Sequence, residues 1–231
     1  ADLLDRLPQE AVESFAGVGY PFAAGVIRPG DVVLDIGSGS GTDLLIAATL
    51  VGGEGRAMGL DMTAAMREKA AANARRMGLS HVELLDGSAE EIPLPDASVD
   101  VVTTNGVLNL VPDKARAARE IRRVLTHPGL FSFSTLGPAS FRELREAWAE
   151  VDQDPHVMAF PEAPSLASGL LRAGFAEPVV DVDTLTIQYR DLGQLLRDLR
   201  ATGTTNAAAG RRRGLTGPDR WRRFAAAWDR R

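Results

Sequence analysis

Three glycines at alternate positions separate an apolar run from a predicted helix. The run ends at Ile36 and contains Asp35, and Gly37, Gly39 and Gly41 follow it. Glycines in such a turn let a ligand approach the backbone closely, and the amino end of the next helix supplies free N–H donors. The pattern predicts a binding site for a nucleotide-like cofactor, and a glycine turn without a ligand is the alternative.

A second acidic residue supports the cofactor interpretation. Asp61 stands 20 positions beyond Gly41, at the end of the next apolar run, where a carboxylate can accept both hydroxyls of a ribose. Nicotinamide and flavin sites favour the spacing G-x-G-x-x-G, whereas the glycines here follow G-x-G-x-G. Asp35 would repel a pyrophosphate but attract the amino group and sulfonium of S-adenosylmethionine. The residues therefore favour S-adenosylmethionine over a dinucleotide.

The elements that must position these residues alternate between apolar runs and helices up to about residue 135, which is typical of a parallel sheet covered by helices on both faces. The five expected strands are 31–36, 56–60, 81–85, 99–103 and 130–134. One helix is expected behind Thr63, with Gly78 as its stop, and another over 140–151. The runs 179–182 and 185–189 are joined by only two residues, so they are expected to form an antiparallel hairpin. The predicted architecture is a three-layer α/β sandwich with seven strands.

The composition narrows the function. The 231 residues contain no cysteine and only three histidines, which excludes thiolate chemistry and gives no reason to expect a metal site. No apolar run approaches the ~20 residues of a membrane span, and no leader is evident, so we expect a cytoplasmic protein. Residues 190–231 carry 11 Arg against 4 acidic residues, leaving a net charge of −12 in the remainder. This basic tail invites an acidic partner.

With these residues, the chain resembles the class I S-adenosylmethionine-dependent methyltransferases over essentially its whole length. The resemblance implies a Rossmann-like sheet of order 3-2-1-4-5-7-6 with an antiparallel last strand. It also implies one domain, with an N-terminal cap (1–28), a cofactor-binding core (29–135) and a substrate-side region (136–231). The cofactor residues that it implies are Asp35, Gly37, Ser38, Gly39, Gly41, Asp61, Met62, Gly87, Ser88, Ala89, Asn105, Gly106 and Val107, with Tyr20 and Phe22 closing over the cofactor.

Within this pattern, Ser88 stands where the family commonly places an acidic residue against the adenine amino group. That contact must then be weaker, or be made by the backbone of Ala89. Residues 105–107 follow the fourth strand and would lie beneath the transferred methyl group.

Two finer resemblances divide the chain. Residues 10–125 are similar to the arsenite methyltransferases, in the segments 12–19, 60–63 and 104–110. The cysteines of that family are missing, because Val18 and Gly106 stand where its pattern would place thiols. Trivalent arsenic is a soft acceptor that needs thiolates, so we do not expect arsenite methylation.

From about Phe131 onward the chain resembles the malonyl-[acyl-carrier protein] O-methyltransferases of biotin synthesis. The matching segments are 133–138, 144–148, 154–157, 171–175, 189–192, 196–200 and 210–217. The chain departs from that family at Met158, where Asn is usual. Such a mosaic is compatible with a natural side branch or with an engineered chimera.

The chemistry of a carboxylate acceptor fits this second half. A carboxylate with a pKa near 4 is already ionised at neutral pH, so its methylation needs no general base and no metal. It needs alignment with the methyl group and a cation to orient it. The candidates for this role are Arg142, Arg145 and Arg190, together with His156.

We therefore predict a methyltransferase that uses S-adenosylmethionine, yields S-adenosylhomocysteine and acts on malonyl-acyl-carrier protein. The alternatives are an arsenite-type or other small-molecule methyltransferase, an RNA methyltransferase that uses the basic tail, and a dehydrogenase-like or non-catalytic cofactor-binding module. The acidic remainder of the chain speaks against nucleic acid. The sequence gives no basis for an oligomeric state.

Overall fold

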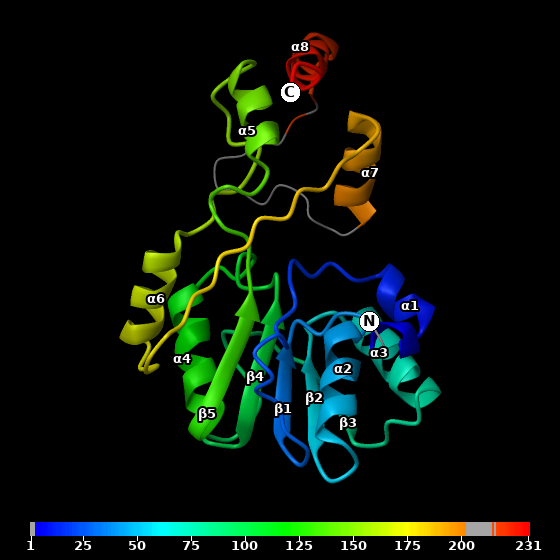
Figure 1. Cartoon of the computed structure of the whole chain (residues 1–231), viewed down its shortest axis with the longest axis vertical. Coiled ribbons are helices and arrows are strands. Elements are labelled where there is room, and N and C mark those ends of the chain that lie inside the picture. Colours follow the sequence, from blue (N-terminus) through cyan, green and yellow to red (C-terminus); the bar gives the residue numbers. More distant parts are fainter. Residues whose placement is uncertain (1–2, 202–213, 215) are drawn as a thin grey trace. The chain divides into compact units, whose positions relative to one another are not determined.

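The structure is a computed structural model that describes residues 3–201, 214 and 216–231 (Figure 1). Two compact units divide the chain, and each is described separately. The first comprises Ala1–Thr135 with Ala167–Val179, and the second comprises Leu136–Leu166 with Val180–Arg231. Arg211, Arg212 and Arg213 of the expected basic tail lie outside the described residues.

The first unit is built on a parallel sheet of five strands in the order β3-β2-β1-β4-β5, all running in one direction (Figure 1). The strands are β1 (Val32–Ile36), β2 (Arg56–Leu60), β3 (Val82–Leu85), β4 (Val99–Asn105) and β5 (Leu125–Ser134). This order confirms the expected 3-2-1-4-5 arrangement. The carboxyl ends of β1, β2 and β4 therefore meet at one edge, where open α/β sheets bind ligands.

Alternate residues of the central strands pack against helices on opposite faces. The helices of this region are α1 (Gln9–Glu13), α2 (Thr42–Val51), α3 (Ala64–Arg76) and α4 (Lys114–Val124), after a short 3-10 turn η1 (Leu4–Arg6). Val33 and Val101 pack with Ile46 of α2, whereas Leu34 and Val102 pack with Ile121 of α4. Successive side chains of a strand point to opposite faces, so this alternation produces the expected three layers.

The helix predicted behind Thr63 is α3, and it ends close to the expected stop. Gly78 follows it with φ of +68°, a left-handed conformation that suits glycine just beyond a helix. The helix predicted over 140–151 is α5 (Arg142–Ala149).

The seven-strand prediction is corrected here, because neither 179–182 nor 185–189 forms a strand. The side chains of the two runs are largely exposed, with Val179 at 93%. Asp181 and Asp183 accept hydrogen bonds from the backbone N–H of the residue that follows each, at 2.9 and 2.7 Å. Such local bonds satisfy the backbone in place of a strand ladder, which the apolar alternation alone does not reveal.

The second unit is helical. Besides α5 it contains α7 (Leu192–Ala201) and α8 (Pro218–Trp228), and α6 (Ala163–Arg172) crosses the boundary between the units. The buried core of this unit consists of Leu144, Ala147, Val151, Leu192, Leu195, Phe224 and Ala227. The ring of Trp148 stacks between His156 and Phe224, with centroid separations of 3.6 and 4.0 Å.

Among the described residues, no helix combines the length and the apolar character that crossing a membrane requires.

Candidate functional site

The glycine turn after β1 adopts a backbone that other residues avoid. The φ angles of Gly37, Gly39 and Gly41 are +72°, +52° and +100°. A Cβ atom on Gly37 would lie 2.3 Å from a methyl group of Val107, so this glycine lets the turn pack against the residues after β4. A Cβ atom on Gly39 would meet nothing nearer than a backbone oxygen at 4.0 Å. The turn is therefore packed on one side and open at Gly39, as a turn that receives a ligand needs to be.

Asp61 ties the glycine turn to the end of β2. One carboxylate oxygen accepts the N–H of Gly39 at 2.9 Å, and the other accepts the N–H of Thr63 at 2.8 Å. Arg67 donates to the carbonyl oxygen of Asp61 at 2.7 Å and also pairs with Asp86, at 2.9 Å. The predicted ribose-binding carboxylate is thus held beside the turn by hydrogen bonds within the protein.

Two buried carboxylates lie beside the turn. Burial and the negative charges of Asp43 and Asp61 raise the pKa of Asp35 well above its usual range, although a hydrogen bond from Thr103 at 3.0 Å opposes this. Burial raises the pKa of Asp43 to about 6, against the stabilising hydrogen bond from Asn105. Two buried acids held together favour a positively charged ligand next to them.

Ser38 offers an unsatisfied polar atom in the same place. Its Oγ is buried and has no hydrogen-bond partner among the described residues. A buried hydroxyl without a partner costs free energy, so this atom is suited to contact a bound group.

The segment after β3 is predicted to contact the adenine, and it is fixed to the rest of the first unit. Ser88 bridges to Glu91, and Ala89 is buried in the core with Ile92. The backbone N–H of Ile92 donates to Glu120 at 3.0 Å, and Arg123 donates to the carbonyl oxygen of Ile92 at 2.9 Å. The segment predicted to face the adenine is therefore anchored on α4.

The remaining predicted cofactor residues occupy different environments. Asn105 ends β4 and Gly106 follows it with φ of +75°. Met62 is 74% exposed beyond the end of β2. Phe22 is buried in the core beside α2, and the half-exposed Tyr20 contacts it edge to face at 5.4 Å. Phe22 therefore packs in the core, whereas the side chain of Tyr20 is accessible from outside the protein.

Several residues of this site have no counterpart in the sequence prediction. The hydroxyls of Ser40 and Thr42 both donate to the carbonyl oxygen of Ala11, at 3.1 and 2.8 Å, and Asn73 donates to the carbonyl of Ser40 at 3.0 Å. Polar residues at the start of a helix usually cap it. The sequence therefore gives no signal that Ser40, Thr42 and Asp43 belong to the site.

The four residues predicted to orient the acceptor belong to the second unit. Arg142 is largely exposed and lies 3.8 Å from Glu143. The guanidinium of Arg145 donates to the carbonyl of Pro138, and the exposed Arg190 uses its backbone N–H to bond Gln194 at 3.2 Å.

His156, the fourth of these residues, has its imidazole 2.9 Å from Asp152, which is also paired with Arg220. These bonds lower the pKa of Asp152 to about 2, against the opposing effect of burial.

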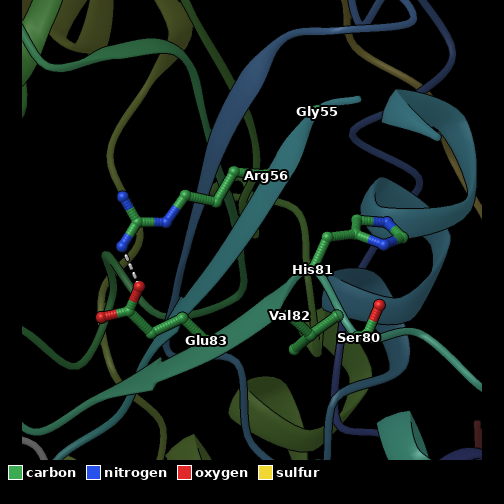
Figure 2. A pocket seen from close by; sticks show the side chains of 6 residues that line it. All are labelled: Gly55, Arg56, Ser80, His81, Val82 and Glu83. Carbon is green, nitrogen blue, oxygen red and sulfur yellow. Dashed lines mark hydrogen bonds and ion pairs between the residues drawn. The ribbon is translucent and has the colours of Figure 1, made fainter. Parts of the chain in front are cut away.

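A surface hollow lies away from this site, at the amino ends of β2 and β3 (Figure 2). Figure 2 shows the ion pair of Arg56 with Glu83 at its wall. His81 contacts the carbonyl oxygen of Ala48 at 2.9 Å. None of the predicted site residues lines this hollow.

The chain is similar in sequence to known methyltransferases. Residues 27–188 match the family model described as a methyltransferase domain. The chain is 37% identical over 231 residues to malonyl-[acyl-carrier protein] O-methyltransferase of Laribacter hongkongensis, covering 99% of the chain and 71% of that protein. It is 37% identical over 198 residues to the protein of the same name from Xylella fastidiosa, covering 86% of the chain and 66% of that protein. Part of each relative thus lies outside the match.

Among solved structures, the chain is similar to an arsenic(III) S-adenosylmethionine methyltransferase from Chlamydomonas reinhardtii. The TM-score is 0.65 at 33% identity, over 87% of this chain and 68% of that one.

Proposed function

The chain belongs to the methyltransferase-domain family, and we propose that it methylates the free carboxylate of a malonyl thioester carried by acyl-carrier protein. It is an S-adenosylmethionine-dependent methyltransferase, as its family and its similarity to solved methyltransferases show. The choice of malonyl-acyl-carrier protein as the acceptor rests on the two bacterial relatives, which are both malonyl-[acyl-carrier protein] O-methyltransferases. One of them aligns with nearly the whole chain.

The described residues fit S-adenosylmethionine. Asp61, whose carboxylate lies beside the glycine turn, would hold the ribose, and the turn is open at Gly39, where a ligand can reach the backbone. The unsatisfied Oγ of Ser38 and the buried Asp35 suit a cationic, polar ligand beside the turn. When bound, the cofactor supplies an electrophilic methyl group.

Methylation of a carboxylate acceptor requires the protein only to bind and orient that carboxylate. A malonyl carboxylate is ionised at neutral pH, so no residue has to remove a proton. Holding the reactants in line supplies several kcal/mol of the barrier reduction, on the order of 7 or more in favourable cases. A chain without cysteine therefore suffices for this chemistry.

For the acceptor clamp we propose a cation among Arg142, Arg145, Arg190 and His156. Arg142 and Arg190 are exposed, with Arg142 3.8 Å from Glu143, whereas Arg145 and His156 are partly buried and contact Pro138 and Asp152. Arg142 and Arg190 therefore have the greater freedom to pair with a substrate carboxylate.

Two broader predictions also remain proposals. The whole chain would act as one methyltransferase domain with the divisions 1–28, 29–135 and 136–231. The protein would work in the cytoplasm, in a biotin precursor pathway.

An alternative acceptor is supported by one observation. The similarity to the Chlamydomonas arsenic methyltransferase extends over most of the chain. Arsenite itself fits poorly, since the chain has no thiolate to bind it, but another small acceptor remains compatible with the first unit. No comparable observation favours RNA.

Mass spectrometry of malonyl-loaded carrier protein tests the proposal. Incubation with the enzyme and S-adenosylmethionine should add roughly 14 Da, one methylene, only when both are present. Acetyl-loaded carrier protein, which lacks the free carboxylate, should gain nothing, because the site must recognise that group. A gain on the acetyl form, or none on the malonyl form from an enzyme that binds the cofactor, would refute it.

A further inference from the structure

The side-chain amide of Asn105 uses its full hydrogen-bonding capacity within the protein. Its Oδ1 accepts the backbone N–H groups of Val18 and Gly19 at 2.8 and 3.2 Å. Its Nδ2 donates to the carbonyl oxygen of Gly19 and to the carboxylate of Asp43, both at 2.9 Å. An amide has two donors and an acceptor oxygen with two lone pairs, so no position is left for a ligand. The side chain is therefore suited to hold other parts of the protein.

The segment that Asn105 holds is packed across the edge of the sheet. A Cβ atom on Gly17 would lie 2.5 Å from Nδ2 of Asn105, and one on Gly19 would lie 2.7 Å from the hydroxyl of Ser134. A Cβ atom on Gly106 would lie 3.4 Å from Val18. Residues 17–19 thus lie against the carboxyl ends of β4 and β5, at the edge where the cofactor residues gather.

The same amide also reaches the glycine turn. Asp43 lies two residues beyond Gly41, in the first turn of α2, and is buried. Its hydrogen bond from Asn105 opposes the rise in pKa that burial causes. One side chain thus connects residues 17–19, the end of β4 and the helix that begins the cofactor turn.

We propose that Asn105 is a positioning residue that latches residues 17–19 over the cofactor site and so retains S-adenosylmethionine. Opening the segment requires breaking three hydrogen bonds to one amide. The latch acts on the cofactor, so it is independent of the acceptor proposed above.

The test compares Asn105→Ala with Thr104→Val in the full chain. Thr104 is the preceding residue of β4 and is buried, and its hydroxyl donates to the carbonyl of Ile36 at 2.9 Å without touching residues 17–19. In Asn105→Ala, hydrogen exchange at Val18 and Gly19 should accelerate at least roughly tenfold, because both amides lose their acceptor. The Kd for S-adenosylhomocysteine, measured by calorimetry, should rise about tenfold. In turnover, KM for S-adenosylmethionine should rise more than kcat falls.

The matched variant separates a latch from a general loss of stability. Thr104→Val should lower Tm while leaving both exchange and S-adenosylhomocysteine binding unchanged. An unchanged Kd in Asn105→Ala, or an equal weakening of binding in Thr104→Val, would overturn the proposal.

If Asn105→Ala does not fold, hydrogen exchange in the wild-type protein still tests whether residues 17–19 are latched over the cofactor. Amide exchange at residues 18 and 19 should be slower with S-adenosylhomocysteine bound than without it, and equal rates would contradict a latch. Since these readouts use the cofactor product alone, a negative result with malonyl carrier protein would leave the latch intact.

Discussion

At the scale of single residues, the site departs from what stability alone would select. Asp35 and Asp43 are both buried beside the glycine turn, and burial together with the charge of Asp43 raises the pKa of Asp35. Burying two acids is unfavourable unless they are neutralised or a cation joins them. The unsatisfied hydroxyl of Ser38 adds to this cost. Several unfavourably buried polar groups in one place are typical of a binding site. The raised pKa values also predict how stability depends on pH.

Asp43→Asn should stabilise the free protein in a pH-dependent way. The folded-state pKa of Asp43 is raised to about 6 from 3.8, so the native state holds its proton more tightly than the unfolded state. Ionisation therefore costs stability as pH rises through this window, and the full cost persists above it. The variant should gain roughly 3 kcal/mol in unfolding free energy at pH 8 and little at pH 4, in urea titrations. An equal gain at both values would show that the charge of Asp43 is not responsible.

Asp61→Ala should weaken cofactor binding. The carboxylate is the predicted ribose ligand and also accepts the N–H of Gly39. Losing hydrogen bonds to a charged group costs about 1.5–3 kcal/mol, so the Kd for S-adenosylhomocysteine should rise at least tenfold. The control is Glu83→Ala, which removes an exposed acid at the hollow away from the site. Equal Kd values for the two variants would show that Asp61 does not bind the cofactor.

Gly37→Ala should destabilise the protein while Gly53→Ala should not. An added methyl at Gly37 would collide with Val107 and would sit at a φ of +72°. At Gly53 nothing lies within 4 Å of the added atom. Overpacking with backbone strain costs on the order of 2–4 kcal/mol, measurable as a fall in Tm. Similar Tm values for both variants would mean that the turn can relax, contrary to the close packing described.

At the scale of elements, sequence periodicity located the sheet of the first unit well. The apolar runs that predicted β1, β2 and β3 lie within one residue of the observed strands, because buried parallel strands need continuous apolar residues. The same reasoning misplaced the run at 179–182, since an apolar pattern does not say whether a partner strand is available. It also missed Asp43, because the environment of a helix-start residue depends on residues far away in the sequence, such as Asn105.

The attachment of α1 to the glycine turn makes a prediction for a whole element. Ser40→Ala combined with Thr42→Val removes both hydroxyls that donate to the carbonyl of Ala11. Thr49→Val removes a hydroxyl from the same helix, α2, that bonds only the carbonyl of Leu45. Hydrogen exchange across Gln9–Glu13 should rise in the double variant and stay unchanged in the control. Unchanged exchange in the double variant would show that these two hydroxyls are not needed to hold α1.

At the scale of the whole molecule, the positive charge of the C-terminal region is partly neutralised within the chain. Arg220 pairs with Asp152 and Asp154. Arg230 and Arg231 both pair with Glu150. Intramolecular pairing of these arginines leaves less positive charge for the acidic partner that the tail predicts, whether carrier protein or nucleic acid. A carboxylate acceptor needs only one well-placed cation, so the proposed activity is compatible with this arrangement.

The chemical nature of the new bond tests the central claim most directly. Malonyl carrier protein methylated with methyl-labelled S-adenosylmethionine should release the label as methanol under mild alkali, because the proposed product is a carboxyl ester. A methyl group attached to carbon or nitrogen has the same added mass but stays on the acyl group or the protein. Quantitative alkaline release from the malonyl form, with no label on the acetyl form, is the predicted result. Label that resists alkali, or label that appears equally on the acetyl form, would contradict carboxylate O-methylation.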